Sequence, residues 1–312
     1  MARPVIRQHS GQINVTFPLK TDLATSYSIT QQSDTLTQQH KHTALDRVMK
    51  QLDLLVGLNN VKDFVYEIYA WLYITQCRKE QGLKGAHQTL HMIFKGNPGT
   101  GKTTVARILG KLFQEMNVLS KGHLVEVERA DLVGEYIGHT AQKTRELVKK
   151  ALGGILFIDE AYSLARGGTK DFGKEAIDCL VKAMEDHKDE FVLILAGYPK
   201  EMEHFLSSNP GLPSRFPVQL EFSNYTVSEL LEIAELMVFE REYELSVQAR
   251  NKLQHFLAAE MRNKHQNFSN ARLVRNLIEK AIREHAVRLL YHPNSSKQEL
   301  MFLSAEDFVP LH

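Results

Sequence analysis

The chain has 312 residues, of which 43% are hydrophobic, and its 38 basic residues nearly balance its 37 acidic ones. This length suits about two domains, and the near-neutral charge argues against a nucleic-acid partner, which requires a basic surface. No apolar run is long enough to cross a membrane, and the N-terminus lacks the apolar core of a signal peptide. Because Cys77 and Cys179 lie far apart in segments of helical periodicity, we expect buried free thiols and a cytoplasmic protein.

The first 44 residues differ in composition from the rest of the chain. They are rich in Gln, Thr, Ser and His and show no hydrophobic period. Such a segment buries too little apolar surface to order itself, which predicts a flexible polar tail; a docking segment is the alternative. From Leu45 to Leu55 the apolar residues recur at helical spacing, and they resume from Val61 to Tyr73 after a break at Gly57. Two helices are therefore expected to lead into the following domain.

Strands and helices then alternate along the chain. Strand candidates lie at residues 90–95, 123–128, 154–159, 191–196 and 218–222, with helical segments between them. This alternation predicts an α/β domain over residues 45–224, built on a doubly wound, parallel, five-stranded sheet.

After Phe222 only helical periods remain. Thr226 and Glu229 have the spacing of a capping box before an apolar period, and further helices are expected at residues 247–262 and 270–290. Residues 225–312 are therefore expected to form a second, helical domain.

A phosphate-binding loop follows the first strand of the sheet. The glycines of its GxxxxGKT motif allow backbone N–H groups to surround an anion, and the next helix directs its positive N-terminal end toward the same point. We therefore expect a nucleoside triphosphate to bind here, with Lys102 on the β- and γ-phosphates and Thr103 on Mg²⁺. The residues of this predicted site are Gly96, Asn97, Pro98, Gly99, Thr100, Gly101, Lys102, Thr103 and the neighbouring Thr104.

Two carboxylates end the apolar strand GGILFIDE of residues 153–160. A fully apolar strand is typical of the centre of a parallel sheet, so Asp159 and Glu160 should lie at its carboxyl edge beside the phosphate-binding loop. We expect Asp159 to hold Mg²⁺ through water and Glu160 to orient or deprotonate the attacking water. Since the chain contains no Asn-Lys-x-Asp motif for guanine, ATP is favoured over GTP. His87 and His91 have a spacing that is compatible with zinc on a helix, but they enter a strand, which argues against a zinc site.

These motifs together resemble an AAA+ ATPase, a P-loop NTPase with a C-terminal helical lid. Residues 132–140 (LVGEYIGHT) and 209–216 (NPGLPSRF) are similar to signatures of the CbxX/CfxQ family, and the likeness extends from about Asp53 to the C-terminus. The resemblance implies an Mg-dependent ATPase that forms a homo-oligomer, usually of six subunits, and remodels a protein client. The greatest likeness is to members from endospore-forming bacteria, which implies a role in sporulation. An AAA+ motor that acts on nucleic acid and a slow, ATP-gated scaffold are the alternatives.

The resemblance also assigns nucleotide-contacting roles to single residues. Val56 and Gly57 match the segment whose backbone lies against adenine, although such a turn is also an ordinary helix junction. Arg215 matches the arginine finger that acts on the nucleotide of the neighbouring subunit; a surface arginine is the alternative. Arg272 matches the lid arginine called sensor 2, and Arg275, one turn away, is the competing candidate.

Two further assignments concern aromatic residues. Tyr198 occupies the place of the polar residue called sensor 1, which is often Asn or Thr; a buried structural tyrosine is an equally good interpretation. Tyr136, Ile137 and Gly138 match the central pore loop of AAA+ remodellers. There the glycine permits movement and the aromatic face grips an extended chain without reading its sequence. Packing of Tyr136 in the core is the alternative.

Overall fold

The computed structural model describes residues 5–9, 12–16, 43–84, 89–136, 138–166, 171–209, 211–263, 268–291 and 295–309. The chain divides into two units, residues 1–42 and 43–312. In the first unit, β1 (Val5–His9) and β2 (Gln12–Thr16) pair as an antiparallel hairpin. Residues 1–4, 10–11 and 17–42, which belong to the tail predicted to be flexible, lie outside the described part of the chain.

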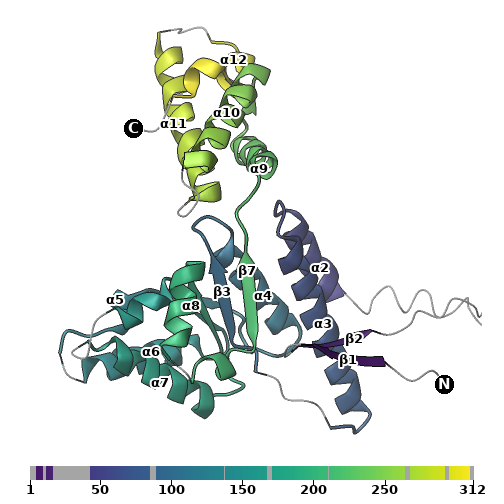
Figure 1. Ribbon diagram of the computed structural model, residues 1–312. Helices are drawn as coiled ribbons and strands as arrows, with labels where there is room; N and C mark the ends of the chain where they lie inside the picture. Colours follow the sequence, from purple (N-terminus) through teal and green to yellow (C-terminus); the bar gives the residue numbers. More distant parts are fainter. Residues whose placement is uncertain are drawn as a thin grey trace, which may run out of the picture. The chain divides into compact units, whose positions relative to one another are not determined.

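The second unit contains the predicted five-stranded parallel sheet (Figure 1). Its strand order is β4-β5-β6-β3-β7, and every neighbouring pair is parallel. The central strands β5 and β6 are buried along their whole length, as their continuous apolar sequences predict for a sheet covered on both faces. The strands are β3 (Met92–Gly96), β4 (Leu124–Val127), β5 (Ile155–Ile158), β6 (Val192–Gly197) and β7 (Val218–Phe222).

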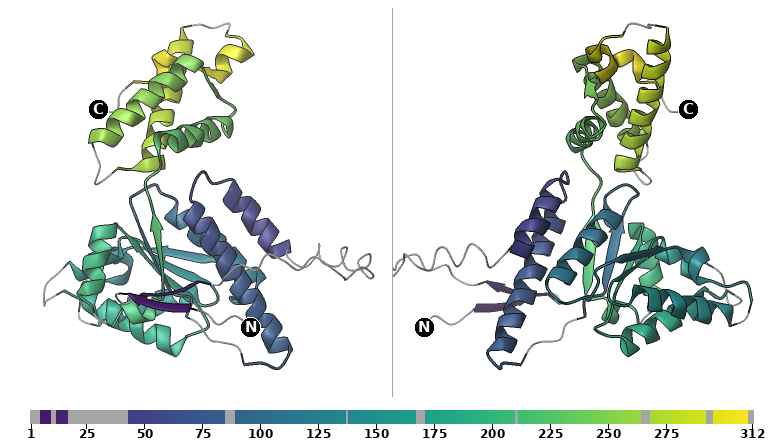
Figure 2. Two further views of the ribbon diagram at one scale, coloured as in Figure 1. Left: turned by 45° about the vertical axis from the view of Figure 1, so that its right-hand side comes forward. Right: turned by 180° about the vertical axis from the view of Figure 1, so that it is seen from behind.

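Helices cover both faces of this sheet, so the doubly wound architecture is confirmed (Figure 2). Alternate residues of a strand point to opposite faces; Phe94 thus packs with the first group of helices and Ile93 with the second. The first group comprises α2 (Thr43–Asp53), α3 (Asn59–Glu80) and α4 (Lys102–Glu115). The second comprises α5 (Arg129–Leu132), α6 (His139–Ala151), the 3₁₀ turn η1 (Ala161–Ala165), α7 (Gly173–Asp186) and α8 (Pro199–Ser207).

The C-terminal region is mainly helical, as predicted. Its first helix begins at the expected capping box, in which the Thr226 hydroxyl accepts the Glu229 N–H at 3.3 Å and the Glu229 carboxylate accepts the Thr226 N–H at 2.7 Å. A short parallel pairing of β8 with β9 is an addition that the sequence did not predict. The elements are α9 (Val227–Phe239), β8 (Glu244–Leu245), α10 (Val247–Asn263), α11 (Asn270–Leu290), α12 (Lys297–Met301), β9 (Phe302–Leu303) and the 3₁₀ turn η3 (Ala305–Asp307).

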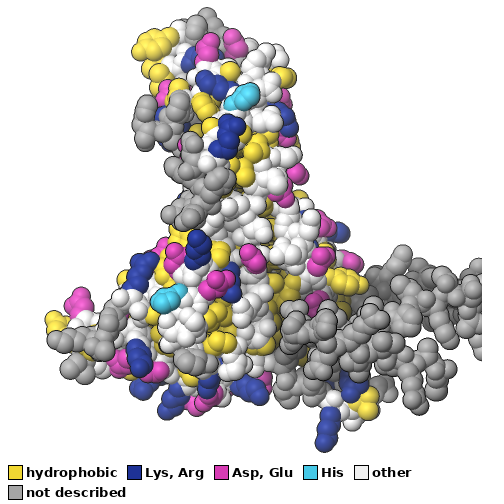
Figure 3. Space-filling model, in the orientation of Figure 1, with side chains coloured by type: hydrophobic (Ala, Val, Ile, Leu, Met, Phe, Trp, Pro, Cys, Tyr) yellow, Lys and Arg dark blue, Asp and Glu magenta, His cyan; other side chains and the backbone are white. Residues whose placement is uncertain are grey.

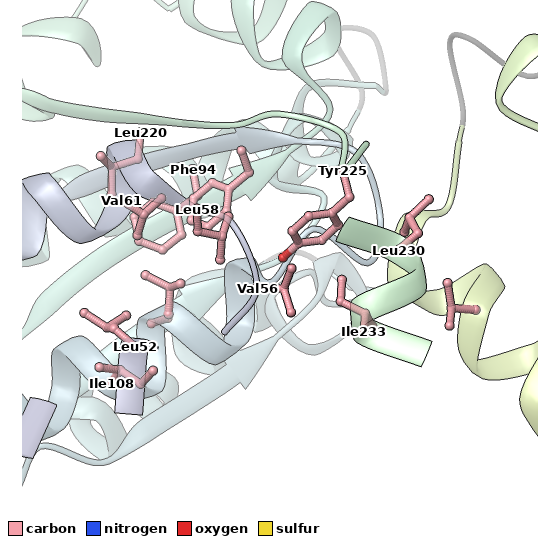
Figure 4. Packing of buried hydrophobic residues seen from close by; sticks show 14 of the residues in the cluster. Leu52, Val56, Leu58, Val61, Phe94, Ile108, Leu220, Tyr225, Leu230 and Ile233 are labelled. Atoms are coloured by element: carbon pink, nitrogen blue, oxygen red, sulfur yellow. The ribbon is translucent and has the colours of Figure 1, made fainter. Parts of the chain in front are cut away.

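One apolar cluster is continuous between the sheet and the C-terminal helices. Figure 4 shows Leu58, Val56, Tyr225 and Ile233 lying next to one another in this cluster. Both cysteines are free, and they are half-buried where full burial was expected. Among the described residues, no helix has the length and apolar character needed to cross a membrane.

Candidate nucleotide-binding site

A polar cavity of about 380 Å³ lies at the carboxyl edge of the sheet. It brings together the phosphate-binding loop, the acidic end of β5, the end of β6 and the start of α11. The cavity therefore joins, at one place, side chains that are separated by more than 170 positions of the sequence. Its lining includes Pro98, Gly99, Lys102, Thr103, Thr104, Glu128, Asp159, Glu160, Tyr198, Arg272 and Arg275.

The phosphate-binding loop connects β3 to α4 and has the backbone that its glycines predict. Gly99 and Gly101 have φ values of 70° and 95°, a left-handed backbone conformation that residues other than glycine rarely adopt. The Thr100 hydroxyl donates to the Asn97 carbonyl at 2.8 Å and closes the turn. Gly101 is also the N-cap of α4, so the free N–H groups of that helix begin at the loop.

Lys102 supplies the positive charge of the phosphate-binding loop. Its ammonium donates to the carbonyls of Gly96 at 2.8 Å and Asn97 at 2.9 Å, which folds the side chain back across the loop. Burial lowers the pKa of Lys102 to about 8, the Asp159 carboxylate opposes this shift and Arg272 adds to it. The loop thus holds a partly desolvated cation that a phosphate would stabilise, so the residues fit a nucleotide.

Asp159 and Glu160 follow β5 directly. An Asp159 carboxylate oxygen accepts the Glu160 N–H at 2.9 Å, and Glu160 has a left-handed backbone with a φ of 46°. The Thr103 hydroxyl donates to Glu126 at 3.2 Å and lines the same cavity as Asp159. One hydroxyl and one carboxylate fit Mg²⁺, which takes few protein ligands and completes its shell with water and phosphate oxygens. The described residues contain no group of three or more His, Cys, Asp or Glu side chains that could hold a metal ion.

Tyr162 contacts two residues of the site, Glu160 and Tyr198, and was not predicted from the sequence. Its ring packs against the end of β6, where a Cβ added to Gly197 would lie 2.7 Å from it. The Tyr198 ring centroid lies 6.0 Å away, and the Arg166 guanidinium lies 4.9 Å from the ring centroid. Burial and the Glu160 carboxylate raise the pKa of Tyr162. Its position two residues after Glu160 was the available signal.

Tyr198 lies at the end of β6, before α8. It lines the cavity and is half-buried. Burial and the Glu160 carboxylate raise the pKa of Tyr198, whereas Arg272 opposes the shift. These features suit a sensor, while the packing on Tyr162 suits a structural role, so both interpretations of this tyrosine stay open.

The arginines considered as nucleotide contacts occupy different surroundings. Arg272 and Arg275, on α11, both line the cavity. Arg215 is not among the described residues that do: it pairs with Glu185 at 2.6 Å and donates to the Gly211 carbonyl at 2.8 Å. A role on a neighbouring subunit is compatible with this location and stays a prediction.

The segment expected to contact adenine lies at the junction of α2 and α3. Val56 is 8% exposed and lies beside Tyr225 and Ile233 (Figure 4). Gly57 has a φ of 64°, and a Cβ there would lie 2.4 Å from a Glu229 carboxylate oxygen. Neither is among the described residues that line the cavity. The adenine assignment therefore stays a prediction.

The loop assigned to a central pore lies between α5 and α6. Tyr136 is 65% exposed and its ring meets His139 edge-on at 5.4 Å, which does not agree with core packing. Gly138 has a φ of 83° and open space around its Cβ position. At the other end, a Cβ on Gly134 would lie 2.5 Å from that of His139, so the base of the loop is tightly packed. Ile137 lies outside the described residues.

His91 takes a structural place in the core. It is 1% exposed, and its Nδ1 accepts the Leu193 N–H at 2.9 Å. This bond fixes the ring beside β6. The second histidine of the pair, His87, lies outside the described residues.

Two family models and a solved structure match the chain. Residues 92–224 match the model of the ATPase family associated with various cellular activities (AAA), and residues 226–312 match the AAA lid domain. A Thermotoga maritima RuvB mutant has the same fold, with a TM-score of 0.50 and 22% identity over 80% of this chain and 69% of that one.

Three curated relatives are similar over most of their length. Stage V sporulation protein K of Bacillus subtilis is 56% identical, with 98% of this chain and 96% of the relative covered. The chloroplastic ribulose bisphosphate carboxylase/oxygenase activase of Cyanidioschyzon merolae is 41% identical, with 91% and 98% covered. The plasmid-encoded protein CbxX of Cupriavidus necator is 43% identical, with 88% and 86% covered.

Proposed function

Since the chain belongs to the CbxX/CfxQ family of AAA ATPases, we propose that it is an ATP-driven, ring-forming remodeller that pulls a client protein through a central pore. The observation that carries the proposal is the exposed Tyr136 on a glycine-flanked loop, in a chain whose candidate nucleotide pocket contains Lys102, Thr103, Asp159 and Glu160.

The proposed chemistry is hydrolysis of ATP to ADP and phosphate. Lys102 holds the β- and γ-phosphates, and Glu160 orients and deprotonates the attacking water. Thr103 and Asp159 would hold Mg²⁺, which neutralises charge on the phosphate oxygens when bound. Arg272 contacts the nucleotide from the lid, and the backbone near Val56 and Gly57 lies against adenine.

Arg215 completes the site of the neighbouring subunit in this proposal. A guanidinium is always charged and stabilises the negative charge of the transferring phosphoryl group. Because Arg215 is not among the described residues that line its own cavity, activity would require an oligomer. We propose a ring of six subunits.

The direction of work follows from the position of Tyr136. In a ring the loop of residues 134–138 would point into the central channel, and lid movements driven by hydrolysis would carry it along the axis. An aromatic face grips an extended polypeptide by apolar contact, without regard to its sequence.

Two observations bear on the biological role and on the alternatives. The similarity to stage V sporulation protein K supports a client in sporulation. Figure 3 shows acidic and basic side chains interspersed over the face in view, in line with a net charge of +1, which disfavours a nucleic-acid motor. A slow ATP-gated scaffold is the remaining alternative, and steady-state turnover with and without a client separates it from a motor.

The first prediction concerns Tyr136. A Glu160→Gln protein should bind ATP and retain clients, so it can be used to capture them by crosslinking in sporulating cells. In the Glu160→Gln protein, the additional substitution Tyr136→Ala should abolish capture of most proteins because it removes the aromatic side chain that contacts the client. The substitution Tyr136→Phe keeps an aromatic side chain and should retain capture. Quantitative mass spectrometry of the crosslinked partners measures this.

Basal ATPase and thermal melting of the two Tyr136 variants, made without Glu160→Gln, are the controls. Both should stay close to the parent because the side chain is 65% exposed. An unchanged set of partners with Tyr136→Ala contradicts the pore-loop role, and a melting temperature that falls by many degrees contradicts the exposed position.

A further inference from the structure

Three asparagines from distant segments meet behind the phosphate-binding loop. Asn97 belongs to that loop, Asn224 to the connection between β7 and α9, and Asn270 is the first residue of α11. The amides of Asn97 and Asn270 both donate to the side-chain oxygen of Asn224, each at 2.9 Å. One exposed acceptor thus joins the loop to the lid.

Asn270 is the most constrained of the three. Its side chain is fully buried, and its backbone has a left-handed φ of 46°. Its oxygen accepts the Tyr225 N–H at 3.0 Å, while its amide also approaches the carbonyls of Phe268 at 2.9 Å and Pro98 at 3.3 Å. A buried amide bonded on all sides fixes its surroundings because any shift leaves polar groups unsatisfied.

Backbone contacts reinforce this junction. The Ala271 N–H donates to the Gly99 carbonyl at 3.2 Å, and the Tyr225 hydroxyl donates to the Thr100 carbonyl at 3.2 Å. A Cβ on Gly99 would lie 2.4 Å from the Ser269 carbonyl oxygen. The start of α11 therefore lies directly on the loop backbone, at a distance that only glycine permits.

This contact determines where Arg272 lies. Arg272 is two residues beyond Asn270 and lines the nucleotide cavity together with Lys102. An arginine has many rotatable bonds, so its head is held over a ligand only if its Cα is fixed. The contacts of Asn270 fix that Cα against the loop that binds the phosphates.

We propose that Asn97, Asn224 and Asn270 form a latch between loop and lid, and that Asn270 is a positioning residue which places Arg272 over the nucleotide. The inference rests on the proposed function only in taking Arg272 as a nucleotide contact. Since Asn97 belongs to the phosphate-binding loop itself, nucleotide binding and lid position would be thermodynamically linked through this latch.

Asn224→Ala is the variant that tests the latch. Asn224 is exposed, so its truncation removes the shared acceptor without creating a core cavity. Ser223→Ala, at the exposed neighbouring position, is the matched control. The full-length protein is examined by hydrogen exchange of the backbone amides at residues 268–276 and by equilibrium binding of fluorescent ADP, each in the wild-type and the Arg272→Ala backgrounds.

We expect Asn224→Ala to speed exchange at the start of α11, with α9 and α10 unchanged. It should weaken ADP binding about fivefold, the effect of a typical hydrogen bond. Ser223→Ala should change neither. In the Arg272→Ala background, Asn224→Ala should add less than about twofold, because residues that act through one another are not additive.

The outcomes separate the latch from the premise. Unchanged exchange with Asn224→Ala overturns the latch. Faster exchange with full additivity in the Arg272→Ala background overturns the positioning role of Asn270. Normal ADP binding by Arg272→Ala alone overturns the proposed role of Arg272 and with it the positioning role, while the exchange data still decide whether the latch exists.

Discussion

Glu160 is held by its own backbone as well as by its neighbours. Its φ of 46° is unusual for a residue with a side chain, and the Asp159 carboxylate caps its N–H at 2.9 Å. Tyr162 lies beside its carboxylate. The hydrogen bonds that shape the phosphate-binding loop do not involve the Glu160 carboxylate, so the conformation of the loop is independent of it.

The second prediction follows from that independence. Glu160→Gln should leave ATP affinity within a few-fold of wild type but lower turnover about 100-fold or more, because it removes the general base and spares Lys102 and Asp159. Equilibrium binding of labelled ATP and phosphate release are measured on the same preparation. Asp159→Asn is the comparison, since loss of a metal ligand should impair Mg-dependent binding as well. Near-normal hydrolysis by Glu160→Gln contradicts the assignment.

The sequence predicted the residues that are contiguous or that follow a strand. Lys102, Thr103 and Asp159 lie in motifs of characteristic spacing, and they line one cavity; their chemical roles stay predictions. Tyr162 and Asn270 were missed because their roles depend on which segments fold against them. A tyrosine or an asparagine has no characteristic spacing that would indicate such contacts.

At the scale of elements, His91 connects two central strands. It lies just before β3, and its Nδ1 accepts the N–H of Leu193 in β6 at 2.9 Å. The rings of Phe191 and Phe216 lie 5.6 and 6.1 Å from it. In this apolar site burial lowers the pKa of His91 to about 4. The folded chain therefore requires the neutral ring.

The third prediction is a pH dependence of stability. The unfolded chain binds a proton at His91 near the ordinary pKa of 6.5, whereas the folded chain does so only near 4. Between these values the unfolded state holds more protons, so stability falls as the pH falls. From pH 7.5 to 5 the loss should be about 2 kcal/mol from this residue. Urea unfolding at both pH values measures it.

His91→Asn is the matched variant for this experiment. Its side-chain oxygen can accept the Leu193 N–H as Nδ1 does, but it does not titrate. We expect the variant to lose less stability than wild type over the same pH range, by about 2 kcal/mol. Equal losses in the two proteins contradict the buried, neutral histidine.

Periodicity predicted the long elements well and the short ones poorly. The five strands lie within two residues of their expected ends, and α10 and α11 begin where the pattern begins. β8 and β9 have two residues each, too few to show an alternation. α3 continues to Glu80, beyond the predicted end at Tyr73. The prediction stopped short because the last turns of the helix are largely polar and show no hydrophobic period. The order of the strands in the sheet was not predicted at all, since it depends on crossovers that periodicity does not describe.

At the scale of the whole molecule, Arg215 is not among the described residues that line the nucleotide cavity of its own chain. Among the described residues, Arg215 pairs with Glu185 and donates to the Gly211 carbonyl, and the ion pair is partly exposed. An exposed pair contributes little to stability. Arg215 is therefore available to contact a second subunit at little energetic cost.

The fourth prediction tests that arrangement by mixing two inactive proteins. Arg215→Ala keeps an intact phosphate-binding loop, and Lys102→Ala keeps an intact finger. In a ring mixed at random from equal amounts, about a quarter of the interfaces should join one intact loop to one intact finger. ATPase activity should therefore recover to about a quarter of wild type, whereas each variant alone stays inactive.

Replacing Lys102→Ala by Glu160→Gln gives the matched control. The Glu160→Gln protein should still bind nucleotide. Recovery of ATPase activity in its mixture with Arg215→Ala therefore does not require a nucleotide-free subunit to assemble into the ring. Native mass spectrometry verifies that both proteins share one oligomer. Arg215 does not act across the interface if verified mixed rings of Arg215→Ala with Lys102→Ala, and of Arg215→Ala with Glu160→Gln, stay inactive at every ratio. Activity of Arg215→Ala alone at the wild-type rate would show that the guanidinium takes no part in hydrolysis, in which case a surface ion pair with Glu185 is its whole role.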